Sequence, residues 1–192
     1  MNKKADMGIG TLIIFIAMIL VAAIAAGVLI QTATSLQNRA LLTGDRSQSQ
    51  VSTSIRPIVV YAEDGSSGSN VDEFYMTLKL APGSDAIKFD DLLLEFSLTN
   101  ESEDLTYKAT VATCNGASLG TEFDVEYLID GGNQEDGYLQ RGDVVKLCFT
   151  SPRAVEEDES IRITMVPKVG SPTVISTAMP DIITEQRVNL FP

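Results

Sequence analysis

MGIGTLIIFIAMILVAAIAAGVLIQTATSLQN occupies residues 7–38, contains no charged side chain, and decides how the first part of the chain folds. Its centre, residues 9–30, is almost wholly apolar and lacks proline. At about 1.5 Å of rise per helical residue, this centre is long enough to cross the ~30 Å hydrocarbon core of a bilayer. The stretch therefore predicts a helix that can span a membrane.

Small residues recur in this apolar run at the spacing of one helical turn. Ala22 and Ala26 are four residues apart, and so are Ala23 and Gly27. Small side chains let helix backbones approach closely, which is how helices associate in an apolar medium. We therefore expect the helix to pack against other helices. The candidate helix-packing positions are Gly8, Gly10, Ala22, Ala23, Ala26 and Gly27.

Two lysines stand just before the apolar run. Lys3 and Lys4 are followed by a long stretch that lacks basic residues. Positive charge beside a membrane span favours the cytoplasmic side. We expect the N-terminus to stay in the cytoplasm and the long C-terminal part to lie outside.

The run GIGTLIIFIAMILVAAIAA, residues 8–26, closely resembles the N-terminal core of archaellins, the archaeal flagellins. The resemblance resumes at LAPGSDAI, residues 80–87, and at the ending VNLFP, residues 188–192. It implies a structural subunit whose hydrophobic helix forms the core of a filament and whose outer domain is an immunoglobulin-like β-sandwich.

The same resemblance implies a short basic leader over residues 1–5. In the family a prepilin-peptidase-like enzyme cuts two residues before the glycine that opens the motif, which places the cut between Ala5 and Asp6. Many family members carry glycine just before the cut, where this chain has Ala5. Bacterial type IV pilins carry glutamate at the fifth mature position, and Gly10 there argues against that relative.

The helix is expected to continue beyond the apolar run, over residues 6–55. Ala33, Leu36, Ala40 and Leu41 keep one apolar stripe on a helix, although the composition becomes polar. The residue before a proline is biased away from helix, so Pro57 places the boundary near residues 55–56. The alternative is a shorter spanning helix followed by a flexible polar stalk.

The rest of the chain, residues 56–192, alternates apolar and polar residues with period two. The pattern occurs at 74–81, 123–130, 145–149 and 161–165, and turn signals at 64–70, 82–84, 115–116, 130–133, 141–143 and 170–172 separate the runs. Such alternation indicates half-buried antiparallel strands. The predicted fold class is α+β, a long N-terminal hydrophobic α-helix followed by an immunoglobulin-like antiparallel β-sandwich.

Composition argues against most chemistry. The formal net charge of −12 disfavours nucleic acid, and the chain has no histidine to act as a general base or zinc ligand. No phosphate-binding loop is present, so any energy for movement must come from a partner. We expect no enzyme, no catalytic residue, no cofactor and no metal. Carboxylates at 90–91, 130, 135–136 and 156–159 lack metal-loop spacing and are interpreted as a solvated acidic face.

Three smaller features stay open. Cys114 and Cys148 are an even pair in a domain expected outside the cell, and form either a disulfide or two packed thiols. Asn100 opens the one Asn-X-Ser/Thr sequon and is a candidate N-glycosylation site, a modification that the resemblance also implies. Arg141-Gly142-Asp143 spells an adhesion tripeptide that a tight turn explains equally well.

The sequence therefore favours a subunit of the archaeal motility filament, the archaellum. It would be an extracellular homo-polymer on the cell surface, made from a precursor in the cytoplasmic membrane. Its partners would be a prepilin-peptidase-like enzyme and the archaellum motor and assembly ATPase complex. One alternative is an adhesion pilin of a type IV-like pilus. The other is a membrane-anchored surface binding module, for which 6% aromatic residues and no tryptophan are a weak basis.

Overall fold

The computed structural model describes residues 3–63, 71–114, 120–183 and 185–192, with side chains from Met7 onward. The chain divides into two compact units, Met1–Ser47 and Gln48–Pro192, which we call the helical unit and the outer unit. The predicted turns at 64–70 and 115–116 lie outside the described residues.

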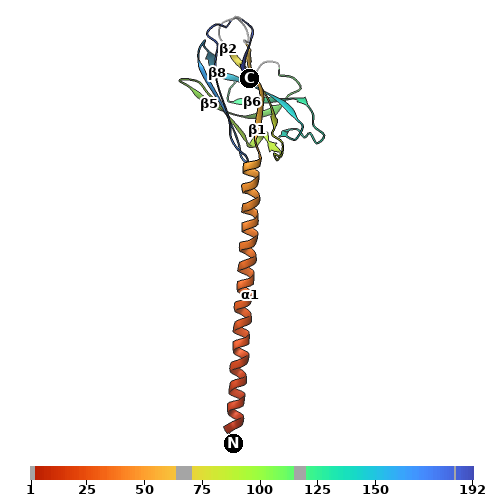
Figure 1. Cartoon of the computed structure of the whole chain (residues 1–192), viewed down its shortest axis with the longest axis vertical. Coiled ribbons are helices and arrows are strands. Elements are labelled where there is room, and N and C mark those ends of the chain that lie inside the picture. The colour runs from red at the N-terminus through yellow and green to blue at the C-terminus, as the bar shows by residue number, and fades with distance from the viewer. Residues whose placement is uncertain (1–2, 64–70, 115–119, 184) are drawn as a thin grey trace. The chain divides into compact units, whose positions relative to one another are not determined.

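One continuous helix, α1, runs from Lys3 to Ser52 and is coloured red to orange in Figure 1. Its interior has no proline to break the backbone hydrogen bonds, and much of it is Ala, Ile and Leu. The polar segment after the apolar run is therefore helical and is not a flexible stalk. The predicted end near residue 55 was wrong by three residues: Ile55, Arg56 and Pro57 belong to the first strand.

Strands make up most of the remaining chain, with a short 3₁₀ helix, η1 (Phe89–Asp91), between two of them. The strands are β1 (Ile55–Glu63), β2 (Val71–Leu80), β3 (Ile87–Lys88), β4 (Leu92–Ser97), β5 (Ser102–Thr110), β6 (Glu122–Ile129), β7 (Tyr138–Leu139), β8 (Val144–Val155), β9 (Ser160–Pro167), β10 (Thr173–Ala178) and β11 (Arg187–Phe191). All four stretches with period-two alternation lie on strands, as predicted, except for the last residues of two of them, Ala81 and Asp130.

Among the described residues, hydrogen bonds order nine of these strands as β10-β9-β4-β5-β6-β8-β2-β1-β11, and β3 pairs with β7. Several of these strands are labelled in Figure 1. The sheet folds over on itself, because Phe96 of β4 packs against Phe74 of β2 and Phe149 of β8 with ring centroids 4.8 and 5.4 Å apart. The two halves enclose one apolar core. The predicted fold class, a long helix followed by a β-sandwich, is confirmed.

One strand pair departs from the antiparallel pattern. The first part of β5 pairs antiparallel with β4, and its second part pairs parallel with β6. Residues 111–121 connect β5 to β6, far more than a tight hairpin needs, so β6 can begin beside β5 in the same direction. β5 thereby links the two halves of the sandwich.

The alternation also fails at several positions, of which Ile129 and Tyr75 matter most here. Ile129 was expected on the apolar face with Phe123 and Val125, which are fully buried, yet Ile129 is 57% exposed. The register shifts between Tyr127 and Ile129, and such a bulge turns the following side chain to the other face. Tyr75, expected on the polar face, is buried in a second cluster outside the main core.

Candidate functional site

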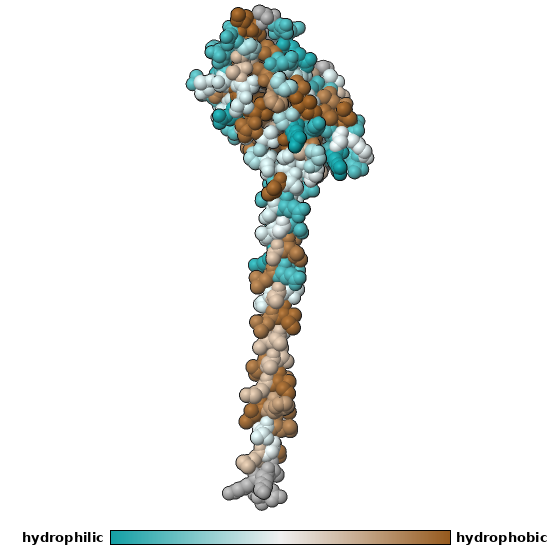
Figure 2. All heavy atoms as spheres, viewed as in Figure 1, coloured by the Kyte–Doolittle hydropathy of each residue, from teal (hydrophilic) through white to brown (hydrophobic). Residues whose placement is uncertain are grey.

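The feature of α1 that calls for a function is its exposed apolar surface. Every described side chain from Met7 to Gln48 is exposed. Among the large apolar residues of the run, exposure ranges from 50% at Ile16 to 71% at Met7. Figure 2 shows brown, hydrophobic spheres along this part of α1, with teal ones becoming frequent further along the helix. A surface of this size and composition marks an interaction with apolar partners.

The threonine hydroxyls on α1 donate to backbone carbonyls within the helix. Thr11 donates to the Gly8 carbonyl at 3.0 Å, and Thr32 donates to the Leu29 carbonyl at 2.9 Å. These bonds give the two threonine hydroxyls an acceptor within the helix, so they need no water to accept their protons. The surface of the apolar run, residues 9–30, therefore suits an apolar environment, either lipid or other helices. By length and composition Met7–Ser52 can cross a membrane, a test that a signal sequence also passes.

The candidate helix-packing residues form open positions on this surface. Ala22, Ala23 and Ala26 are exposed. No atom outside the local helix lies within 4 Å of the place where a Cβ would stand on Gly8, Gly10 or Gly27. A second helix could approach closely at these positions, and their role in packing stays a prediction.

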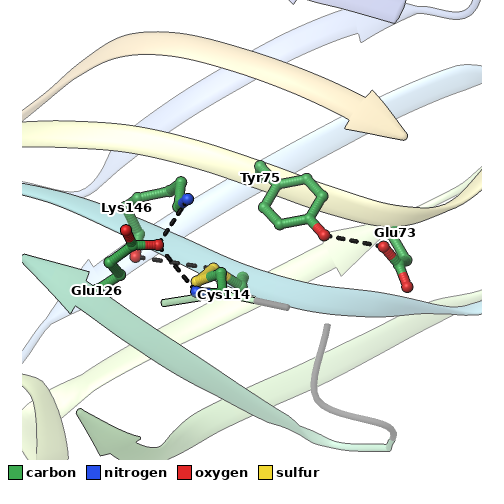
Figure 3. The surroundings of a disulfide bond; sticks show 6 residues. Glu73, Tyr75, Cys114, Glu126 and Lys146 are labelled. Atoms are coloured by element: carbon green, nitrogen blue, oxygen red, sulfur yellow. Dashed lines mark hydrogen bonds and ion pairs between the residues drawn. A yellow bond between two sulfur atoms is a disulfide. The ribbon is translucent and has the colours of Figure 1, made fainter. Parts of the chain in front are cut away.

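The outer unit has a second buried cluster, which sequence patterns did not reveal. A disulfide joins Cys114, after β5, to Cys148 of β8 with their Cα atoms 6.3 Å apart (Figure 3). Cys148 is fully buried, and it packs in one apolar cluster with Tyr61 and Tyr75. The two tyrosine rings stack with centroids 5.1 Å apart. The bond thus ties the segment after β5 onto the outer face of the β2 and β8 strands.

Charged side chains form hydrogen bonds and an ion pair beside this cluster. Glu126 accepts a hydrogen bond from the Cys114 backbone N–H at 2.9 Å and pairs with the Lys146 ammonium at 2.6 Å. Burial raises the pKa of the Glu126 carboxyl, but these two donors outweigh burial and leave its pKa below the ordinary value. On the other side, the Tyr75 hydroxyl donates to Glu73 at 2.8 Å (Figure 3). Burial, with that carboxylate as the next cause, raises the pKa of Tyr75.

Comparison with known proteins identifies the family. Residues 5–177 match archaeal-type flagellin. The chain is 31% identical over 188 residues to Flagellin B3 of Halobacterium salinarum, covering 96% of this chain and 93% of that protein. It is 30% identical over 211 residues to Flagellin B1 of Methanococcus voltae, covering 98% and 96%. The chain belongs to the archaeal-type flagellin family.

A solved structure shares the fold of this archaeal flagellin. The subunit in the archaeal flagellum of Methanospirillum hungatei superposes with a TM-score of 0.72 at 16% identity, over 96% of this chain and 99% of that one. The resemblance found in residues 8–26 is therefore confirmed, and with it the predicted role as a structural subunit of the archaellum.

The remaining candidate residues of this flagellin lie on different elements. Asn100 is exposed on the short connection between β4 and β5, where the Leu98 N–H donates to the Glu101 carbonyl at 2.7 Å. The junction of Ala5 and Asp6 lies within α1, and its side chains are outside the described residues. Among the described residues, no group of three or more His, Cys, Asp or Glu side chains could hold a metal ion.

The adhesion-like tripeptide is a turn with a buried carboxylate. Asp143 is 1% exposed. Its two oxygens accept hydrogen bonds from the Gly131 and Gln140 N–H groups, both at 2.8 Å. Gly142 has a φ of 97°, which favours glycine. The carboxylate therefore organises the turn and is not available to a partner.

Proposed function

We propose that this flagellin polymerises through α1 into a helical filament, with the outer unit forming the coat. The observation that carries the proposal is the exposed apolar surface from Met7 to Ile30. Each large apolar side chain left in water forgoes about 1.5–3 kcal/mol of burial free energy. A subunit with more than a dozen of them exposed needs an apolar partner along the whole run.

The partner would change during assembly. In the precursor, lipid covers α1; in the filament, identical helices from neighbouring subunits cover it. The apolar surface meets little water in this exchange, so the hydrophobic effect opposes it weakly. Close packing at Ala22, Ala23, Ala26 and Gly27 adds dispersion contacts that lipid does not provide. Head-to-tail contacts that do not close then produce helical symmetry.

Maturation would remove the charged leader that holds the N-terminus on the cytoplasmic side of the membrane. A prepilin-peptidase-like enzyme would remove residues 1–5 on the cytoplasmic side, so that Asp6 becomes the first residue. The filament would stand on the cell surface, and the precursor in the cytoplasmic membrane. The subunit would have no catalytic role, and a separate motor and assembly ATPase complex would supply rotation and energy.

The N-terminal sequence and intact mass of protein sheared from cells test this maturation. We expect a chain that begins at Asp6 and is recovered from filaments. A chain that still begins at Met1 and occurs only in membranes would overturn the proposal and favour an anchored binding module. Loss of swimming, with attachment intact, in a deletion strain would assign the filament to motility and not to adhesion.

Substitution of the small residues tests the assembly surface. Ala22→Leu with Ala26→Leu keeps the helix apolar but prevents close approach, so we expect few filaments or a changed subunit spacing in electron micrographs. Ala33→Leu with Ala40→Leu is the matched control, because it adds the same atoms outside the small-residue run. Normal filaments with unchanged spacing in the first variant would contradict the packing role.

We also propose that Asn100 carries an N-linked glycan. Its exposure on a turn leaves space for a sugar to project into solvent. Mass spectrometry of the Asn100 peptide from native filaments should show added hexose-type mass that disappears in Asn100→Gln. An unmodified peptide from wild-type filaments would rule the glycan out.

A further inference from the structure

Pro57 explains why the helix ends before residues 55–56, but not why it already stops at Ser52. Thr53, Ser54 and Ile55 are neither glycine nor proline, and Pro57 is five residues beyond the end. The last carbonyls of a helix have no partner within it and must find one elsewhere. The end of α1 is therefore decided by the groups that receive these carbonyls.

Two loops of the outer unit satisfy them. Ser171, in the turn between β9 and β10, donates from its hydroxyl to the Gln50 carbonyl at 3.4 Å and from its N–H to the Thr53 carbonyl at 2.8 Å. Ser84, in the loop after β2, donates to the Ser52 carbonyl at 3.3 Å or to the Ser54 carbonyl at 3.2 Å. These residues all lie in the outer unit.

The same loops fix the two residues that link helix to strand. Ser54 donates its N–H to the Ser84 hydroxyl at 3.0 Å, and its carbonyl accepts from the Ala81 N–H at 3.0 Å. The Thr53 hydroxyl accepts from the Asp85 N–H at 3.2 Å. Ser84 and Asp85 belong to the stretch 80–87, which resembles archaellins. Assembly through α1 gives this stretch no role.

Gly170 packs directly against Thr53. A Cβ built on it would lie 2.7 Å from the Thr53 carbonyl oxygen and 3.2 Å from the Thr53 Cβ, and its φ is 129°. Thr53 itself is 1% exposed. Both the space and the backbone conformation therefore require glycine here. We call residues 81–85 and 170–171, closed around residues 50–54, the clasp.

We propose that the clasp is the joint through which torque and tension carried by α1 enter the outer unit. The proposal rests on filament assembly through α1. Thr53 and Ser54 have four soft backbone dihedrals, and a link of this kind turns freely unless other contacts hold it. The clasp holds both residues through hydrogen bonds from two loops, so the last turn of α1, which itself belongs to the outer unit, is fixed to the loops of that unit.

Hydrogen exchange on intact filaments tests the joint. Ser84→Ala removes the hydroxyl that accepts from the Ser54 N–H and donates to the Ser52 or Ser54 carbonyl, and Ser176→Ala is the control because Ser176 is exposed on β10. We expect peptides covering residues 49–55 to exchange about 5- to 30-fold faster in Ser84→Ala, while those covering 144–149 stay unchanged. Gly170→Ala, which acts from the other loop, should give the same result. The filaments should also bend more, seen as a shorter persistence length in electron micrographs.

Three results would overturn the proposal: unchanged exchange at 49–55, an equal rise at 144–149, or faster exchange with unchanged filament stiffness. Ser84→Ala subunits could fail to form filaments while wild-type subunits form them. In that case hydrogen exchange is compared on detergent-solubilised full-length subunits. Faster exchange at 49–55 alone supports the proposal, and unchanged exchange there or an equal rise at 144–149 overturns it. If wild-type subunits themselves form no filament, the proposed function fails, and with it the mechanical role of the clasp.

Discussion

Removal of the disulfide is the perturbation whose effect can be worked out most directly. Cys114 and Cys148 are 34 residues apart in the sequence. Closing a loop of this length lowers the entropy of the unfolded chain by an amount equivalent to about 4 kcal/mol at 25 °C. A typical domain is stable by about 5–15 kcal/mol in total, so the bond supplies a large share.

The native structure should survive its loss. Glu126 holds the Cys114 backbone without the bond, and Lys146 holds Glu126. We therefore expect Cys114→Ala with Cys148→Ala to fold, with a Tm lower by about 8–16 °C, since each kcal/mol shifts Tm by about 2–4 °C in a chain of this size.

The assay is thermal unfolding of the full-length subunit in detergent, followed by circular dichroism in the β-sheet region, with and without reductant. Cys114→Ala alone is the matched control, because it breaks the bond but keeps the buried Cys148 side chain in place. The Tm of reduced wild type should equal the Tm of this single variant. A Tm within about 2 °C of oxidised wild type in both variants would refute the entropic reasoning.

Two further predictions concern buried or paired carboxylates. Asp143→Ala leaves the Gly131 and Gln140 N–H groups without their acceptor, so unfolding free energy should fall by about 3–5 kcal/mol in denaturant titrations; exposed Asp130→Ala should change it by less than about 0.5 kcal/mol, and equal effects would contradict the role of the turn. Hydrogen bonding from Arg153 holds the pKa of Glu159 below the ordinary 4.5, so the stability it contributes is present above pH 4.5 and is lost as pH falls through the lower, folded-state pKa. Glu159→Gln should flatten the dependence of Tm on pH below 4.5, and an unchanged profile would count against this pairing.

Local patterns predicted the elements of this flagellin well. The uncharged run 7–38 lies in α1, and the alternating runs lie on β2, β6, β8 and β9. Helix and strand periodicities arise from residues a few positions apart, so a single sequence records them. The candidate assembly surface was predictable for the same reason, because exposure of an apolar helix follows from its composition and length.

Other features depended on residues brought together from distant parts of the chain. The parallel pairing of β5 with β6 follows from the path of their connection, and the bulge after Tyr127 follows from pairing with β8. The buried pair of Tyr61 and Tyr75 lies on two strands and is covered by the segment of Cys114, so it became apparent only in the folded chain.

The sequence alone determined that a long apolar helix precedes an acidic β-domain, and that small residues mark one stretch of the helix. The tertiary structure alone decided that α1 ends at Ser52, that Asp143 is buried in its turn, and that Gly170 must lie against Thr53. Each of these depends on hydrogen bonds or close contacts between segments separated by 12 to more than 100 positions. Such contacts leave no local periodicity, so only the folded chain brings their partners together.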